Sequence, residues 1–201
     1  MQISKKLSAV LPLVLLLACG LGSSCSNKDS IPAKAIQVGD KAPDFSLPDA
    51  SGHFMKLSDV QPRTWLVLVF YRGSWCHSCM NQLLDLKKDI QKFTDLHVAL
   101  AAVSVDTVED CSIFNNQWRF PFPLLSDTQF RLIDAYGARD IAGGDKKQDI
   151  SRRSVVIIDP QKIVRYIHIG KESGDWLDTD ELLYNIQKVQ SAVNAQPGGA
   201  S

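Results

Sequence analysis

The chain has 201 residues, and 22 Lys and Arg residues balance 22 Asp and Glu residues, so the formal net charge is zero. This balance argues against a nucleic-acid-binding protein, because such proteins carry an excess of basic residues. Hydrophobic residues make up 45% and charged residues 22% of the sequence, which excludes a disordered or collagen-like chain. Five cysteines are too few for a disulfide-stapled scaffold, so each needs its own explanation.

The first thirty residues differ in composition from the rest of the chain. Lys5 and Lys6 precede an almost wholly apolar stretch, 7–18, which is too short to span the ~30 Å hydrocarbon core of a membrane comfortably. Such a stretch suits the apolar region of a secretory signal peptide. It ends in Leu-Leu-Ala directly before Cys19 and resembles a bacterial lipobox, whose cysteine is lipidated and becomes the new N-terminus. We therefore expect a lipoprotein signal peptide over 1–18; an uncleaved anchor or plain secretion are the alternatives.

A polar stretch rich in Gly, Ser, Asn and Lys follows the lipobox. It predicts a flexible tether over residues 19–35, in which Cys25 has no catalytic role. The lipobox resemblance implies a protein of the bacterial cell envelope, held to a membrane by its N-terminal lipid on the periplasmic or extracytoplasmic face. One folded domain is predicted over 36–194, followed by a disordered tail over 195–201.

The domain alternates between strand-like and helix-like patterns. Continuous apolar runs predict central strands, covered on both faces, at 64–71 and 97–105. Apolar residues at helical spacing predict helices at about 78–93, 107–118, 130–136 and 179–193. The helix at 107–118 has Asp106 or Thr107 as its predicted N-cap. The remaining elements are predicted to be short extended pieces at 40–47, 54–57 and 124–125, a polar loop at 138–150, and a strand pair at 154–158 and 163–169. This order predicts an α/β fold with a central mixed sheet flanked by helices.

Cys76 and Cys79 form a C-x-x-C motif where the first central strand meets the following helix. The positive end of a helix dipole and the free N–H groups there stabilise a thiolate, which is the reactive form of cysteine. Arg72 and His77 add positive charge nearby. In an exported protein, this motif near a βαβ pattern favours redox chemistry. A zinc site would need two further ligands at suitable spacing, and a purely structural disulfide would close only a very small loop.

Five stretches of the chain match those of a known family. They are Val38–Phe45, Phe70–Cys79, Val103–Thr107, Phe122–Asp127 and Arg153–Asp159. Together they make the chain resemble the thioredoxin-like superfamily and, within it, the peroxiredoxin (AhpC/TSA, redoxin) branch over about Gly39–Val189. The resemblance implies a thioredoxin-like fold and a thiol-dependent antioxidant enzyme that reduces peroxides through a cysteine thiolate and a C-x-x-C disulfide.

The peroxiredoxin register assigns roles to individual residues. Arg72 falls at the family's proline, Cys76 at its threonine and Cys79 at its peroxidatic cysteine. Arg153 falls at the active-site arginine, which implies that its guanidinium lowers the thiolate pKa and hydrogen-bonds the peroxide oxygens; Arg152 is the adjacent alternative. Thiolate attack on the O–O bond would give a sulfenic acid, which a second thiol resolves as a disulfide.

Cys111 is a second candidate resolving thiol besides Cys76. It lies in the predicted helix after the second central strand, about one turn before the helix position that carries the resolving cysteine in some thiol peroxidases of this superfamily, and residues four apart share a helix face. The alternative for Cys111 is a buried cysteine that behaves as a small hydrophobic residue.

Two further functions remain open. In a thioredoxin-type thiol–disulfide oxidoreductase acting on exported proteins, Cys76 would be the nucleophile and Cys79 the resolving thiol. Thioredoxins usually place a cis-proline on the strand facing the motif, and here Ser154 takes that position. In a metallochaperone, the two thiolates would hold a soft metal, with His168 as a candidate third ligand.

The sequence lacks the Gly-x-Gly-x-x-Gly pattern of a dinucleotide site. We therefore expect no cofactor and no resident metal, and we expect the reducing equivalents to come from an external thiol. The expected substrate is a peroxide or a protein disulfide.

Overall fold

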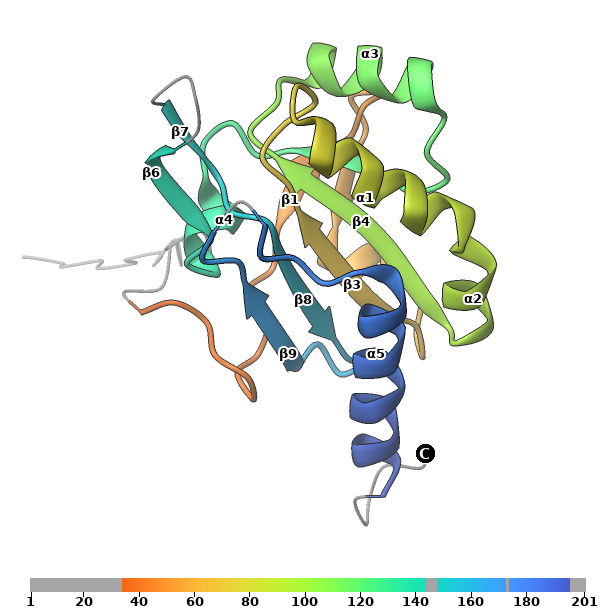
Figure 1. Ribbon diagram of the computed structural model, residues 1–201. Coiled ribbons are helices and arrows are strands. Elements are labelled where there is room, and N and C mark those ends of the chain that lie inside the picture. The colour runs from red at the N-terminus through yellow and green to blue at the C-terminus, as the bar shows by residue number, and fades with distance from the viewer. Residues whose placement is uncertain (1–33, 144–147, 173, 196–201) are drawn as a thin grey trace, which may run out of the picture. The chain divides into compact units, whose positions relative to one another are not determined.

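The computed structural model describes residues 34–143, 148–172 and 174–195. At its centre lies a five-stranded sheet with the spatial order β5-β4-β3-β8-β9 (Figure 1). The strands in this order are β5 (Leu124–Ser126), β4 (Val98–Ser104), β3 (Trp65–Phe70), β8 (Ser154–Ile158) and β9 (Val164–Ile169). β3 pairs in parallel with β4 and antiparallel with β8, so the sheet is mixed, as predicted.

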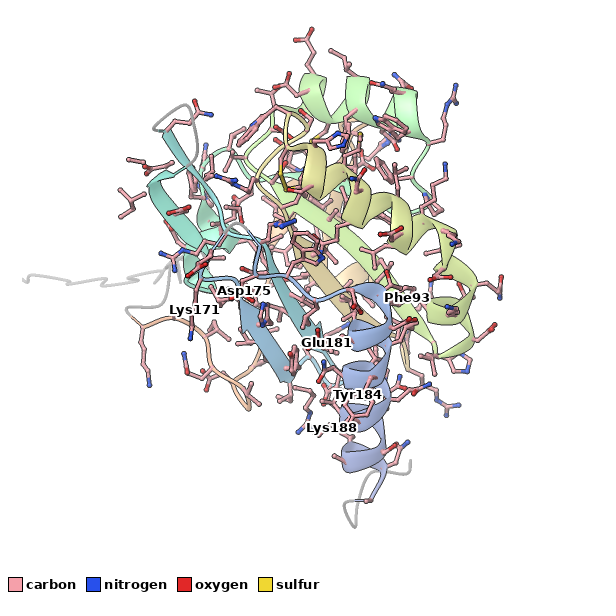
Figure 2. All side chains as sticks on the ribbon, in the orientation of Figure 1. Phe93, Lys171, Asp175, Glu181, Tyr184 and Lys188 are labelled. Atoms are coloured by element: carbon pink, nitrogen blue, oxygen red, sulfur yellow. A yellow bond between two sulfur atoms is a disulfide. The ribbon has the colours of Figure 1, made fainter. Side chains whose placement is uncertain are left out.

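Helices cover the sheet. They are α1 (His77–Lys88), α2 (Ile90–Asp95), α3 (Val108–Trp118), α4 (Arg131–Ala135) and α5 (Thr179–Asn194). The closing helix α5 buries Leu182 and Ile186 and exposes Tyr184 and Lys188 (Figure 2), which is the amphipathic pattern that the sequence predicts. Within the described ranges, no helix combines the length and apolar character needed to cross a membrane.

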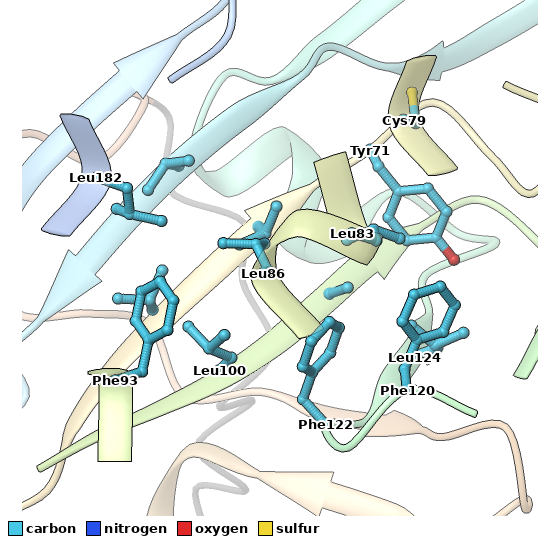
Figure 3. Packing of buried hydrophobic residues seen from close by; sticks show 14 of the residues in the cluster. Tyr71, Cys79, Leu83, Leu86, Phe93, Leu100, Phe120, Phe122, Leu124 and Leu182 are labelled. Carbon is cyan, nitrogen blue, oxygen red and sulfur yellow. The ribbon is translucent and has the colours of Figure 1, made fainter. Parts of the chain in front are cut away.

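The core lies on both faces of the sheet because successive side chains of a strand point to opposite faces. Val67 and Val69 of β3 pack on the face covered by α1, α2, α3 and α5 (Figure 3). Leu66 and Leu68 pack on the other face, against α4, the short helix η1 (Leu57–Asp59) and the hairpin of β1 (Ser46–Pro48) and β2 (Phe54–Lys56). A strand buried on both faces explains the continuous apolar run in the sequence.

Two predicted elements differ from the structure. The helix predicted over 78–93 is broken at Asp89, which ends α1 and precedes α2. Apolar spacing continues across the break, because Leu86 of α1 and Phe93 of α2 are both buried in one cluster, so periodicity alone does not reveal it.

The segment predicted as a loop over 138–150 instead contains the antiparallel strands β6 (Arg139–Gly143) and β7 (Gln148–Ser151). Polar contacts hold this hairpin: the Arg139 guanidinium binds the carboxylates of Asp134 at 2.6 Å and Asp149 at 3.1 Å. Such a strand pair lacks the apolar alternation by which strands are predicted.

Of the extended piece predicted over 40–47, only the end belongs to a strand, β1. The other boundaries agree with the predictions to within a few residues, and Thr107 is the N-cap of α3. The predicted signal peptide (1–18), lipidated Cys19 and Cys25 lie outside the described residues. So do nearly all of the predicted tether (19–35) and C-terminal tail (195–201).

Candidate active site

The loop between β3 and α1 carries the C-x-x-C motif at the carboxyl end of the central strand. Gly73 has a φ of +150°, and a Cβ atom there would come within 2.5 Å of Nε1 of Trp75 and 3.0 Å of Oδ1 of Asp106. The Ser74 N–H donates to Oδ2 of Asp106 at 2.7 Å, and the Cys76 N–H donates to the Gly73 carbonyl at 3.0 Å. These contacts turn the chain so that Cys76 stands at the start of α1.

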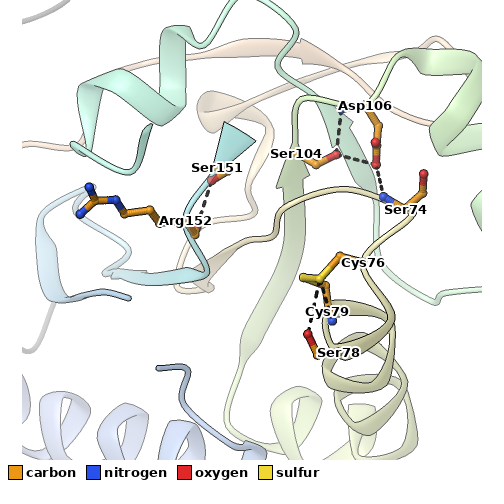
Figure 4. The surroundings of a disulfide bond; sticks show 8 residues. All are labelled: Ser74, Cys76, Ser78, Cys79, Ser104, Asp106, Ser151 and Arg152. Atoms are coloured by element: carbon orange, nitrogen blue, oxygen red, sulfur yellow. Dashed lines mark hydrogen bonds between the residues drawn. A yellow bond between two sulfur atoms is a disulfide. The ribbon is translucent and has the colours of Figure 1, made fainter. Parts of the chain in front are cut away.

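Cys76 and Cys79 are joined by a disulfide, with their Cα atoms 5.2 Å apart (Figure 4). Cys79 is fully buried, whereas Cys76 is 5% exposed, so Cys76 is the outer sulfur of the pair. Its Sγ also lies 3.5 Å from the hydroxyl of Ser78. An external thiol that attacks this disulfide would therefore reach Cys76 first.

Cys76 is also the N-cap residue of α1. Its sulfur accepts a hydrogen bond from the Cys79 N–H at 3.3 Å, as a serine or threonine oxygen does at this position. Cys79 lies in the first turn of the helix, where the dipole and the unpaired N–H groups favour negative charge. The start of the helix thus favours a thiolate on either cysteine when the disulfide is reduced, and the Cys76 sulfur is the one that accepts the helix N–H.

A buried carboxylate, that of Asp106, hydrogen-bonds to the backbone of this loop. Oδ2 of Asp106, just beyond the end of β4, accepts from the Ser74 N–H and from the Ser104 hydroxyl at 3.0 Å. Burial raises the pKa of the Asp106 carboxyl above its usual value, while the hydrogen bonds from Ser74 and Ser104 oppose the rise. The sequence analysis predicts Asp106 only as a possible helix N-cap and misses its role at the loop. The feature that could have revealed this role is the pair of polar residues Ser104 and Asp106 at the end of the strand that runs parallel to β3.

Arg153 lies at the same end of the sheet as the motif. Ser154 pairs with Phe70 at the end of β3, which places Arg153 opposite Tyr71. Arg153 is only 3% exposed, and its guanidinium lies 3.5 Å above the ring of Trp176. Burial and, to a smaller extent, the charge of Arg72 together lower the pKa of Arg153 to about 10, so Arg153 is cationic at neutral pH.

Arg152, the adjacent alternative, is half-buried. Figure 4 shows its side chain extending away from the disulfide. Between these two neighbours, the inward-facing arginine is therefore Arg153. Ser154, at the position where thioredoxins have their proline, lies in the register with Phe70.

Cys111 lies on α3 and is a free, buried thiol. Burial raises the pKa of this thiol to about 12, and the nearby charge of Asp106 also raises it. The Tyr71 hydroxyl beside Cys111 is buried as well. The structure pairs Cys79 with Cys76 and leaves Cys111 unbonded.

His168, the candidate third metal ligand, faces a carboxylate. Its Nε2 lies 3.0 Å from Oδ1 of Asp175. In the parts of the chain that the structure describes, no three His, Cys, Asp or Glu side chains are grouped so that they could hold a metal ion.

The chain matches the model of the AhpC/TSA family over residues 38–167. It belongs to the AhpC/TSA family. Its relatives include a candidate peroxiredoxin of Mycobacterium tuberculosis, 32% identical over 131 residues, which cover 64% of this chain and 83% of the relative. Peroxiredoxin Bcp of Bacillus subtilis is 29% identical over 63% of this chain and 80% of its own length. The thiol–disulfide oxidoreductase ResA of Bacillus subtilis is 28% identical over 62% and 69%.

Solved structures of AhpC/TSA-type proteins share the fold. Peroxidoxin BcpB of Mycobacterium tuberculosis superposes with a TM-score of 0.65 at 23% identity, covering 78% of this chain and 97% of BcpB. A cysteine-to-serine mutant of peroxiredoxin 6 from Arenicola marina superposes with a TM-score of 0.73 at 21% identity, over 83% and 80%. The predicted thioredoxin-like fold is confirmed. The protein is a thiol-dependent oxidoreductase of the peroxiredoxin-like kind.

Proposed function

We propose that this enzyme reduces hydroperoxides with Cys79 as the peroxidatic thiol and Cys76 as the resolving thiol. The observation that carries the proposal is the Cys76–Cys79 disulfide in the first turn of α1. This bond is the product expected after a sulfenic acid on one of these cysteines has condensed with the other.

The reaction has three balanced steps. The Cys79 thiolate attacks the terminal oxygen of ROOH, the O–O bond breaks, Cys79 becomes a sulfenic acid, and RO⁻ takes up a proton to leave as ROH. The Cys76 thiol then attacks the sulfenic sulfur, and water leaves as the disulfide forms. Finally, one thiol of an external dithiol attacks Sγ of Cys76 and expels Cys79 as a thiolate, and its second thiol then attacks the mixed disulfide, releases Cys76 and closes the reductant's own disulfide.

The environments of the two sulfurs support this division of roles. Cys79 lies in the first helical turn, where the helix dipole favours its thiolate, and Cys76 occupies the N-cap position in place of the family's threonine. The cationic, buried Arg153 lies at the same sheet end and supplies N–H donors of the kind that bind peroxide oxygens. Cys76 is the more exposed sulfur, which suits attack by an external reductant.

A second function is favoured by that same exposure. If Cys76 is the thiol that partners reach, the reduced pair can also attack disulfides of other proteins, with Cys79 completing the exchange. The relative ResA is named a thiol–disulfide oxidoreductase. In this function Cys76 is the nucleophile, so the two activities depend on different cysteines.

Peroxide consumption with dithiothreitol as the reductant tests the proposal, with insulin disulfide reduction measured in parallel. Many turnovers of hydrogen peroxide per enzyme are expected, lost in Cys79→Ser and kept in Cys111→Ala, the matched control. Peroxide loss no faster than with dithiothreitol alone, together with accelerated insulin reduction that needs Cys76, would assign the enzyme to disulfide exchange.

The location proposed for the enzyme is the bacterial cell envelope. Residues 1–18 act as a lipoprotein signal peptide, Cys19 carries the lipid, and residues 19–35 tether the domain to the membrane surface on its periplasmic or extracytoplasmic side. The lipobox-like sequence before Cys19 supports this. Expression of the full chain in bacteria should give a membrane-bound product whose N-terminal peptide carries acyl chains on Cys19. A soluble product with an unmodified Cys19 would contradict it.

A further inference from the structure

A charged pocket of about 120 Å³ lies beside the active-site loop. Its walls come from the segment after β3, from β6, from the junction between β7 and β8, and from the loop after β9, which carries Lys171 and Asp175 (Figure 2). The lining residues are Arg72, Asp140, Arg152, Arg153, Gly170, Lys171 and Glu172. Four cations face two carboxylates, so the walls carry two positive charges in excess.

Two of the four cations, Arg72 and Arg152, differ from other arginines of the domain in their partners. Arg139 binds Asp134 and Asp149, and Arg165 binds Asp159 at 2.6 Å. In contrast, Arg72 and Arg152 have no carboxylate within 4.0 Å in the described part of the chain. Arg72 and Arg153 both line the pocket, and the charge of Arg72 lowers the pKa of Arg153. An anion bound between them would relieve the repulsion.

Aromatic rings hold two of these cations at the pocket. Arg72 lies 5.5 Å from the ring centroid of Trp75, and Arg153 lies 3.5 Å from that of Trp176. Both tryptophans are 38% exposed. A guanidinium stacked on an indole keeps its N–H donors at its edge, where they can bind a planar oxyanion with two parallel hydrogen bonds. The site therefore combines oxyanion donors with exposed apolar surface.

The pocket's size and charge limit the ligand. At about 120 Å³ the pocket has room for a small oxyanion. Asp140 and Glu172 in the same lining reduce the four positive charges to a net two. A carboxylate has the planar, two-oxygen shape that the edge of a guanidinium binds with two parallel hydrogen bonds.

We propose that this pocket binds the carboxylate of an organic hydroperoxide, so that the enzyme prefers carboxylate-bearing aryl or alkyl hydroperoxides to neutral ones. This inference rests on the proposed peroxidase function and names its substrate class. The carboxylate is held by Arg72 and Arg152, and the apolar body lies along Trp75 and Trp176. The hydroperoxide group then reaches Cys79, which takes the terminal oxygen as a sulfenic acid while the remainder leaves as the alcohol.

Binding is tested first, without any reaction. The probe is the para-carboxylate of cumyl alcohol, the product of the corresponding hydroperoxide, and its methyl ester is the neutral control. Titration followed by tryptophan fluorescence should show saturable binding of the carboxylate, at least about tenfold tighter than the ester and weaker at high salt. Arg152→Gln should remove this difference, and Arg63→Gln, an exposed arginine before the opposite end of β3, should keep it. Equal binding of acid and ester, or inorganic phosphate competing as strongly as the carboxylate, would overturn the inference.

Turnover is tested with the matching pair of hydroperoxides, the para-carboxylate of cumene hydroperoxide and its methyl ester. The ratio of their kcat/KM values should be about ten in the wild type and fall to about one in Arg152→Gln. A ratio near one in the wild type would overturn the substrate assignment while leaving the peroxidase intact. Saturable carboxylate binding without turnover of either hydroperoxide, or of hydrogen peroxide, would instead overturn the peroxidase function and keep the anion site.

Discussion

The Asp106 carboxylate and the Ser74 backbone N–H, 2.7 Å apart, join the end of β4 to the loop that presents Cys76. Asp106 is buried, and it also accepts from the Ser104 hydroxyl. The loop therefore takes its position from the neighbouring parallel strand as well as from its own sequence. Asp106 acts as a positioning residue, because it contacts the loop backbone.

Replacing Asp106 with Ala removes this link and leaves the N–H of Ser74 without its acceptor. We expect the free energy of unfolding to fall by about 1–3 kcal/mol and the rate of Cys79 oxidation by hydrogen peroxide to fall about ten- to hundredfold. Urea unfolding and stopped-flow fluorescence measure the two effects. Asp95→Ala, which changes an exposed aspartate at the end of α2, is the control. An oxidation rate equal to that of the wild type would show that the loop does not need this bond.

Much of the fold is predictable from local sequence. β3 and β4 are continuous apolar runs, as strands covered on both faces must be. The break at Asp89 is not predictable from spacing, because the residues on either side keep their helical periodicity. The hairpin of β6 and β7 depends on the contacts of Arg139 with Asp134 and Asp149, which no local pattern reveals.

Some residues of the site are likewise predictable from local sequence, whereas others are not. Cys76 and Cys79 are visible as a motif, because only two residues separate them in the sequence. Arg153 is found only through the family resemblance, since it lies far from the motif in sequence and comes near it through pairing of β3 with β8. The link between Ser74 and Asp106 spans 32 positions and exists only because β3 and β4 lie side by side in register. The pocket beside Arg72 needs four separate segments to meet.

Gly73 provides a test of the loop geometry. Its φ of +150° is rarely adopted by residues with a Cβ, and an added Cβ would collide with Trp75. Gly73→Ala should therefore lower both the melting temperature and the rate of Cys79 oxidation, with a backbone cost of about 1–3 kcal/mol. Gly52→Ala is the matched control: its φ is +80°, but no atom lies within 4 Å of the added Cβ. It should cost about 1 kcal/mol and leave the oxidation rate unchanged. If both variants oxidise at the wild-type rate, the contact between Gly73 and Trp75 is irrelevant to the chemistry.

Cys111 should be unreactive in the folded protein. Burial raises its pKa to about 12, so the neutral thiol dominates below that pH, and only about one molecule in ten thousand is a thiolate near pH 8. Labelling with iodoacetamide, mapped by mass spectrometry to the peptide that contains Cys111, should be negligible in native protein and complete in urea. Raising the pH should increase labelling only as it approaches the pKa or unfolds the domain. Rapid native labelling at neutral pH would contradict the burial and restore Cys111 as a resolving thiol.

Trapping of the first oxidation product identifies the peroxidatic sulfur directly. Reduced Cys76→Ser protein is mixed with hydrogen peroxide and dimedone, and the modified residue is identified by mass spectrometry while the rate is compared with that of free cysteine. The account predicts a dimedone adduct on Cys79, formed far faster than on free cysteine and absent from Cys79→Ser. Rapid adduct formation on Cys76 in Cys79→Ser, with none on Cys79 in Cys76→Ser, would contradict it and make Cys76 the nucleophile.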